Sequence, residues 1–195
     1  MRVGLFGGSF DPIHIAHLMV AQIASEELDM DKVIFIPAKV SPLKVDTPYL
    51  FTDSQRLEML RLATKGNERF EVSDFEISLP RVSYTYLTVE YFYDRYKGEE
   101  LFLIVGGDSF ESFCKWKNYK DIVTKVKIVV YPRENRCICI PRELEEFRER
   151  IIVLNGPLVD ISSTMIRERI KHNKEVRYFL PCEVYNYIVE LASKS

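Results

Sequence analysis

The chain has 195 residues, of which 47% are hydrophobic and 29% charged, a composition typical of an ordinary folded protein. A chain of this length fits one domain, which we expect to span residues 1–195 and to bury an ample core. The formal net charge of −2 gives no overall attraction to nucleic acid or to an anionic membrane. An anionic ligand must therefore be bound by a local cluster of donors.

Targeting and metal-binding patterns are also lacking. Too few apolar residues precede Gly7 for a signal peptide, and no apolar run reaches the length of a membrane span, so we expect a cytoplasmic protein with no membrane partner. The cysteines at 114, 137, 139 and 182 lack the paired C-x-x-C spacing of a zinc site. We expect free thiols and no protein-bound metal.

Residues 2–17 carry the most informative pattern in the chain. A short apolar strand at 3–6 is followed by a turn at 7–12 and by an amphipathic helix at 15–28 that begins beside His14 and His17. Glycines at 7 and 8 let another molecule approach the main chain, and a helix start offers N–H groups and partial positive charge. This combination suits phosphate, although a tight strand-to-helix turn or a metal-binding histidine pair are alternatives.

The rest of the chain alternates strands with helices. We expect strands at 33–36, 101–105, 126–131 and 151–154, a loop at 38–51, a helix from Thr52 to Gly66, an extended stretch at 70–77, a helix from 85 to Gly98, and a solvated charged helical face at 143–150. Strand, helix and strand with short connections indicate a parallel βαβ unit. The sequence therefore predicts a mostly parallel α/β sheet.

Two further junctions offer donors or carboxylates. The strand at 101–105 ends in Gly106, Gly107 and Asp108, at the sheet edge where open α/β folds bind ligands, although Asp108 could serve only as a helix cap. Residues 161–167 place three hydroxyl residues at a helix start and Arg167 within the next turns, an arrangement that suits an anion. An ordinary cap, for which one hydroxyl suffices, is the alternative. A small C-terminal helical portion should span about 161–195.

These motifs resemble one enzyme family. The run GGSFDPIH followed by His17 resembles the opening motif of the His-x-Gly-His nucleotidyltransferases, and among them the bacterial nicotinate mononucleotide adenylyltransferases. The run ISSTMIR at 161–167 matches the family's second motif without a break. Ala16 stands where the family usually has glycine, which leaves open how closely a nucleotide base can approach the turn. The resemblance implies a Rossmann-like, doubly wound sheet with helices on both faces.

The resemblance also implies a set of site residues. His14, His17 and Arg167 would be catalytic. ATP would be bound by Gly7, Gly8, Ser9, Phe10, His14, His17, Lys44, Gly106, Asp108, Ile161, Ser162, Ser163, Thr164 and Arg167. The second substrate would be bound by Ser83, Tyr84, Thr85, Trp116 and Arg133. Several of these have plainer interpretations: Lys44 as a solvated charge, Ser83 or Thr85 as a helix cap, and Trp116 as core. The match around Arg133 is loose.

The implied reaction is adenylyl transfer from ATP to nicotinate mononucleotide, which yields nicotinate adenine dinucleotide and pyrophosphate in NAD biosynthesis. Mg²⁺ would be carried by ATP, because the sequence shows no carboxylate cluster that would make a protein cage for it. A homo-oligomer is possible. Other adenylyl- or cytidylyltransferases, such as pantetheine-phosphate adenylyltransferase, and a non-catalytic nucleotide sensor remain alternatives. Neither G-x-G-x-x-G nor a P-loop motif is present, which disfavours a dehydrogenase and excludes a P-loop enzyme.

Overall fold

The structure, a computed structural model, describes residues 1–40, 48–80, 82–132 and 138–194. Within these ranges, six strands form one sheet in the order β3-β2-β1-β4-β5-β6, and every neighbouring pair is parallel. The strands are β1 (Arg2–Gly8), β2 (Lys32–Pro37), β3 (Phe70–Val72), β4 (Glu100–Gly106), β5 (Lys127–Tyr131) and β6 (Ile151–Val153). The expected mostly parallel α/β sheet is confirmed.

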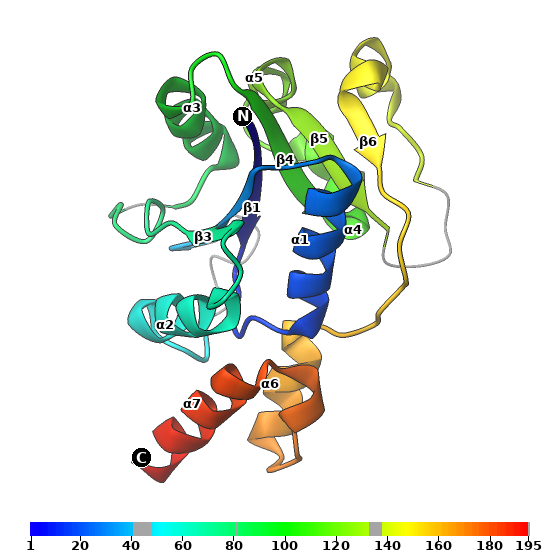
Figure 1. Ribbon diagram of the computed structural model, residues 1–195. Helices are drawn as coiled ribbons and strands as arrows, with labels where there is room; N and C mark the ends of the chain where they lie inside the picture. Colours follow the sequence, from blue (N-terminus) through cyan, green and yellow to red (C-terminus); the bar gives the residue numbers. More distant parts are fainter. Residues whose placement is uncertain (41–47, 81, 133–137, 195) are drawn as a thin grey trace.

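Helices cover both faces of the sheet (Figure 1). One face packs against α1 (Ile15–Glu27) and α2 (Asp53–Thr64); the other packs against α3 (Thr85–Arg95), α4 (Gly107–Glu111), α5 (Tyr119–Lys125) and the 3-10 helices η1 (Phe113–Lys115) and η2 (Arg142–Arg150). The C-terminal helices α6 (Ser163–Lys171) and α7 (Cys182–Ser193) lie beyond the end of the sheet, and their buried side chains join the core on the α1 and α2 face. A third 3-10 helix, η3, spans Arg177–Phe179. This arrangement is the predicted doubly wound fold, including its C-terminal helices.

Apolar runs in the strands follow from this double covering. Successive residues of a strand point to opposite faces, so Leu5 lies in one core and Phe6 in the other, and the same holds for Val129 and Val130. All four side chains are less than a tenth exposed. Strands buried on both sides need apolar residues at consecutive positions, and full burial of each such side chain contributes about 1.5–3 kcal/mol.

The chain changes direction between β1 and β4, and this change positions the site. From β1 the chain moves outward to β2 and β3, and then returns to place β4 on the other side of β1. At such a switch point the connections leave on opposite faces, which opens a crevice outside the carboxyl ends of the two central strands. Figure 1 shows α6 and α7 beyond that same end of β1.

Local signals in the sequence place most element ends correctly. The predicted capping box is present: Gln55 N donates to Thr52 Oγ1 at 3.3 Å, and Thr52 N donates to Gln55 Oε1 at 2.9 Å. Gly66 and Gly98 adopt φ of +90° and +89° in the turns that follow α2 and α3, which end slightly earlier than expected, at Thr64 and Arg95.

The extended stretch expected at 70–77 is wrong beyond Val72, where β3 ends. From there the backbone turns, with Ser78 N donating to Asp74 O at 2.9 Å and Phe75 N to Ser73 Oγ at 3.3 Å. Serine and aspartate side chains stabilise such turns locally and override the apolar alternation around them. In the described part of the chain, no helix is long and apolar enough to cross a membrane.

Candidate active site

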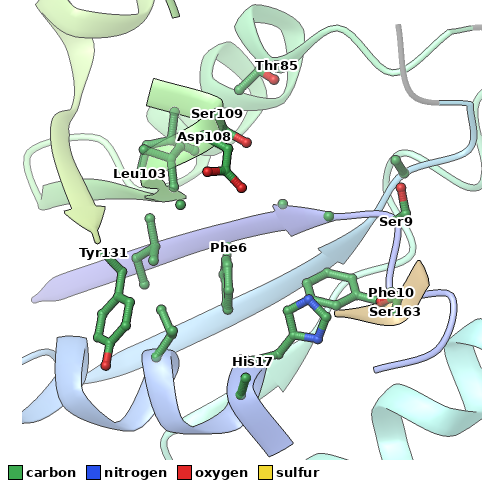
Figure 2. Close-up of a pocket in the computed structure, with 18 of the residues that line it drawn as sticks. Phe6, Ser9, Phe10, His17, Thr85, Leu103, Asp108, Ser109, Tyr131 and Ser163 are labelled. Atoms are coloured by element: carbon green, nitrogen blue, oxygen red, sulfur yellow. The ribbon is translucent and has the colours of Figure 1, made fainter. Parts of the chain in front are cut away.

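A cavity of about 790 Å³ lies at the switch point. Its walls come from both faces of the sheet: Figure 2 shows Asp108 and Ser109 on one side of the central strands, and Phe6, His17 and Tyr131 on the other. A cavity of this size is typical of small-molecule sites. The cavity extends from the N-terminus of α1 to the N-terminus of α3, because residues of both helices line it.

Most of the residues that the sequence nominated meet in this cavity. They are Gly7, Gly8, Ser9, Phe10, His14, His17, Ser83, Tyr84, Thr85, Gly106, Asp108, Trp116, Ile161, Ser162, Ser163 and Thr164. Arg167 is not among the lining residues, but its guanidinium donates to the backbone oxygen of Asp11, in the first motif, at 2.8 Å. Lys44 and Arg133 lie outside the described residues. The roles of all these residues stay predictions.

The two histidines form a compact unit at the start of α1. Their rings stack with centroids 3.7 Å apart, and His14 is almost wholly buried. The backbone N–H of His14 donates to Nδ1 of His17 at 3.3 Å. Because Nδ1 accepts, the neutral His17 ring carries its proton on Nε2, which makes Nε2 the hydrogen-bond donor. The ring of Phe10, 5.0 Å away, packs edgewise on His17 (Figure 2).

The second motif lies directly against the first. Ser163 Oγ donates to the backbone oxygen of Pro12 at 2.9 Å. Ser162 caps α6 by accepting from Met165 N at 3.2 Å, so the ordinary cap interpretation also holds for this residue. Thr164 Oγ1 accepts from Arg167 at 3.1 Å. The N-termini of α1 and α6 therefore meet at one end of the cavity, where their partial positive charges add.

Two buried charged residues that sequence reasoning missed hold the first motif in place. The carboxylate of Asp11 accepts from Leu50 N and Phe51 N, both at 2.9 Å. The fully buried guanidinium of Arg56 donates to Ser9 O at 2.6 Å and to Ala38 O at 2.8 Å. Asp11 stood inside the quoted motif and could have been nominated from it. Arg56 looks in sequence like a polar position of an amphipathic helix.

Arg56 also sets the protonation of a neighbour. Burial alone would raise the pKa of Asp53, but hydrogen bonds from Lys39 and Arg56 outweigh it and hold the pKa of Asp53 below its ordinary value. The bond between Arg56 and Asp53 measures 2.8 Å. The segment after β2, the start of α2 and the glycine turn are thus tied together through one guanidinium.

The other end of the cavity is formed by the start of α3 and by η1. Ser83 is fixed by Lys39 N, which donates to its Oγ at 2.8 Å, and by its own N–H, which donates to Val40 O at 2.9 Å. Trp116 is partly buried and packs on Phe113 with centroids 5.2 Å apart, so it contributes to the core as well as to the cavity wall. The ammonium of Lys117 lies 4.8 Å from the ring centroid of Tyr84.

Metal ligands are not gathered here. Among the residues that the structure describes, no group of three or more His, Cys, Asp or Glu side chains could hold a metal ion. The donor set of the cavity, which consists of imidazoles, hydroxyls and helix N-termini, is suited to an anion instead.

A parallel sheet with its cavity at the switch point places the chain among the open α/β proteins that bind ligands at the carboxyl ends of their strands. The chain belongs to the cytidylyltransferase-like family, whose model matches residues 5–169, and its near relatives are named as nicotinate-nucleotide adenylyltransferases. The family resemblance drawn from the two motifs is therefore confirmed.

Relatives and solved structures agree over almost the whole chain. A probable nicotinate-nucleotide adenylyltransferase of Caldicellulosiruptor saccharolyticus is 39% identical, covering 97% of this chain and 96% of its own. One from Flavobacterium psychrophilum is 39% identical, covering 96% of each. The fold is similar to that of Plasmodium falciparum nicotinic acid mononucleotide adenylyltransferase complexed with NaAD, with a TM-score of 0.78, 17% identity and coverage of 97% and 95%.

Proposed function

We propose that the chain transfers the adenylyl group of ATP to nicotinate mononucleotide. A phosphate oxygen of the mononucleotide attacks the α-phosphorus of ATP, the bond from that phosphorus to the bridging oxygen breaks, and pyrophosphate leaves with the electron pair. The observation that carries the proposal is the meeting of two donor-rich helix N-termini, from opposite ends of the chain, at one cavity. The relatives' shared name supports the choice of substrates.

The triphosphate would lie at the end formed by α1 and α6. The imidazoles of His14 and His17 would meet the phosphates near the reacting centre, and Ser162 to Thr164 would receive the β- and γ-phosphates. Arg167 would turn from the backbone oxygen of Asp11 towards the phosphates. Donors that are fixed in advance stabilise the charge that grows on the leaving pyrophosphate, and no protein nucleophile is needed.

The base and ribose of ATP would occupy the rest of the first-motif side. Gly7 and Gly106 leave room for close approach, since a Cβ added at either would meet nothing within 4 Å. Gly8 differs, because its added Cβ would lie 3.0 Å from the ring of Phe10. Gly7, Gly8, Ser9, Phe10, Gly106, Asp108 and Ile161 are proposed as ATP contacts, and the family resemblance adds Lys44.

The acceptor would lie at the α3 end. The exposed face of Trp116 would stack on the pyridine ring, and Ser83, Tyr84 and Thr85 would receive its acid group, with Arg133 near the phosphate. Lys117 beside Tyr84 supplies a positive charge at this end. A cation there favours an acceptor with a carboxylate over the neutral amide.

The residues fit Mg²⁺ only as a companion of ATP. The polar part of the lining includes imidazoles and hydroxyls that suit phosphate, and the described residues hold no ligand cluster for a metal. When bound to the nucleotide, Mg²⁺ supplies positive charge that offsets the charge developing on the phosphates. The protein's own part is to position two anions and to donate hydrogen bonds to them.

A pyrophosphate-release assay tests the proposal. The purified protein is incubated with ATP or CTP and with nicotinate mononucleotide, nicotinamide mononucleotide or phosphopantetheine. We expect turnover with ATP and nicotinate mononucleotide, and much slower turnover with the amide. Faster turnover with CTP or phosphopantetheine would assign another reaction of the family, and saturable ATP binding without any pyrophosphate release would indicate a sensor.

A further inference from the structure

A buried carboxylate on the acceptor side of the cavity has no part in the transfer as described. Glu76 lies in the turn that follows β3, lines the cavity and is only 7% exposed. Within the described residues it forms no salt bridge, although burying a carboxylate without a cation is unfavourable. We therefore expect the Glu76 carboxylate to have a positioning role through its hydrogen bonds.

Glu76 holds two hydroxyl groups of the acceptor wall. Thr88, one turn into α3, donates its hydroxyl to Glu76 Oε1 at 2.5 Å. The Ser83 side chain also lies close enough to the Glu76 carboxyl group to lower its pKa. Because Ser83 Oγ already accepts from Lys39 N at 2.8 Å, its single proton remains available for this carboxyl group. One carboxylate therefore ties together the Ser83 turn and the first turns of α3.

The segment fixed in this way is the one expected to receive the acid group of the acceptor. Ser83, Tyr84 and Thr85 all line the cavity, and α3 begins at Thr85. The N-terminus of α3 carries partial positive charge, but that charge helps only if the N–H groups point at the ligand. The orientation of this turn depends on Ser83, whose backbone N–H is bonded to Val40 O at 2.9 Å.

We propose that Glu76 is a positioning residue for the acceptor: by accepting hydrogen bonds from Ser83 and Thr88, it holds the Ser83–Thr85 turn in the conformation that binds the pyridine acid group. This inference rests on the proposed function, because it assigns the α3 end of the cavity to nicotinate mononucleotide. Glu76 itself does not touch the reacting atoms. Its effect should therefore appear in the binding of one substrate only.

The test is the Glu76→Gln variant, measured with each substrate varied in turn. The amide accepts from only one oxygen, so one of the two hydroxyls loses its partner. We expect the KM for nicotinate mononucleotide to rise about tenfold, the effect of one charge-assisted hydrogen bond, while the KM for ATP changes less than about twofold. Glu90→Gln, on the exposed side of α3, is the matched control and should leave both KM values unchanged.

Smaller changes keep the proposal testable if Glu76→Gln does not fold. Ser83→Ala and Thr88→Val each remove one donor and leave the carboxyl group in place. Each should raise the KM for nicotinate mononucleotide, and the effect of Ser83→Ala should shrink in the Glu76→Gln background because the two act through one bond.

Two results would overturn the proposal: unchanged KM values in all three variants, or parallel rises for both substrates, which indicate a general structural role. Failure of the proposed function is distinguishable, since the wild-type protein would then release no pyrophosphate and calorimetry would detect no binding of nicotinate mononucleotide. That result would remove the acceptor assignment and this inference together.

Discussion

The imidazole of His17 is fixed before any substrate arrives. Its Nδ1 accepts from the backbone of His14, and aromatic rings of Phe10 and Phe6 pack on it with centroids at 5.0 and 6.1 Å. A side chain held by its neighbours loses little entropy when it donates to a phosphate, so it stabilises the transition state effectively. The buried His14 ring stacks on the His17 ring with centroids 3.7 Å apart and restricts its movement further.

Replacing His17 with alanine should therefore remove catalysis and spare the fold. Loss of one positioned donor costs about 3–4 kcal/mol in the transition state, a fall of roughly 10² to 10³ in kcat. Pyrophosphate release measures the rate, and circular dichroism checks the fold. His172→Ala is the control, because His172 lies at the far end of α6. Wild-type turnover in His17→Ala would show that His17 has no catalytic role.

Glu76 and Asp53 should have opposite effects on how the free energy of unfolding changes with pH, because their pKa values are shifted in opposite directions. Burial raises the pKa of Glu76 above 4.5, and hydrogen bonds from Thr88 and Ser83 only partly offset this. A raised pKa means that the folded protein holds this proton more tightly than the unfolded chain. The contribution to stability is then complete below pH 4.5 and is lost as the pH rises through the raised pKa.

Glu76→Gln abolishes this titration. Its free energy of unfolding, relative to that of the wild-type protein, should increase as the pH is raised from about 4 to about 7, as measured by urea unfolding at several pH values. A difference that stays constant with pH would contradict the raised pKa. If Glu76→Gln is more stable than the wild-type protein at neutral pH but has a higher KM for nicotinate mononucleotide, then Glu76 positions the acceptor site and does not merely stabilise the fold.

Residues of this kind explain where sequence reasoning stops. His17, Ser163 and Arg167 were nominated because they sit in motifs of specific spacing. Arg56 acts through a partner far away in the sequence, Ser9, and Glu76 acts through Thr88, which belongs to the next helix. In the sequence both occupy ordinary polar positions, and only the packing of separate segments shows that they are buried.

At the scale of elements, α2 is the support of the glycine turn. Its residue Arg56 reaches Ser9 O and Ala38 O, and its guanidinium lies 4.2 Å from the ring centroid of Tyr49. The segment just before α2 adds the backbone N–H groups that bind Asp11. The first motif is therefore a loop clamped by a helix that does not itself line the cavity, and the capping box of α2 fixes where that helix begins.

Removing the Arg56 side chain should cost both stability and function. Arg56→Ala removes the donor to Ser9 O, to the buried Ala38 O and to Asp53 Oδ1, and we expect the free energy of unfolding to fall by about 3 kcal/mol. Arg61→Ala, on the exposed side of the same helix, should change it by less than about 0.5 kcal/mol. Urea unfolding measures both. Arg56→Lys should recover only part of the lost stability, because an ammonium group cannot reproduce the planar, forked hydrogen bonding of a guanidinium. Full recovery would show that the positive charge alone matters.

At the scale of the whole molecule, the two ends of the chain complete one site. The sequence predicted the parallel βαβ unit and the mostly parallel sheet correctly, because strand, helix and strand units with short connections leave few topologies. It did not predict how the second motif meets the first. That contact depends on α6 and α7 packing beyond the carboxyl end of β1, with buried Ile166, Val184 and Ile188 joining the core that includes Phe10 and Ile13.

The contact between the two motifs predicts that ATP protects the backbone amides of both motifs from hydrogen exchange together. Amide hydrogen exchange should slow at residues 7–17 and at 161–167 at the same ATP concentration, because both segments contact one triphosphate. The amides of η2, far from the cavity, serve as the control. Arg167→Ala should require higher ATP for protection of both segments, not only its own, because the shared ligand couples them. Protection of residues 7–17 alone would mean that α6 does not bind the triphosphate, and the proposed transfer would then lose the donors for its leaving group.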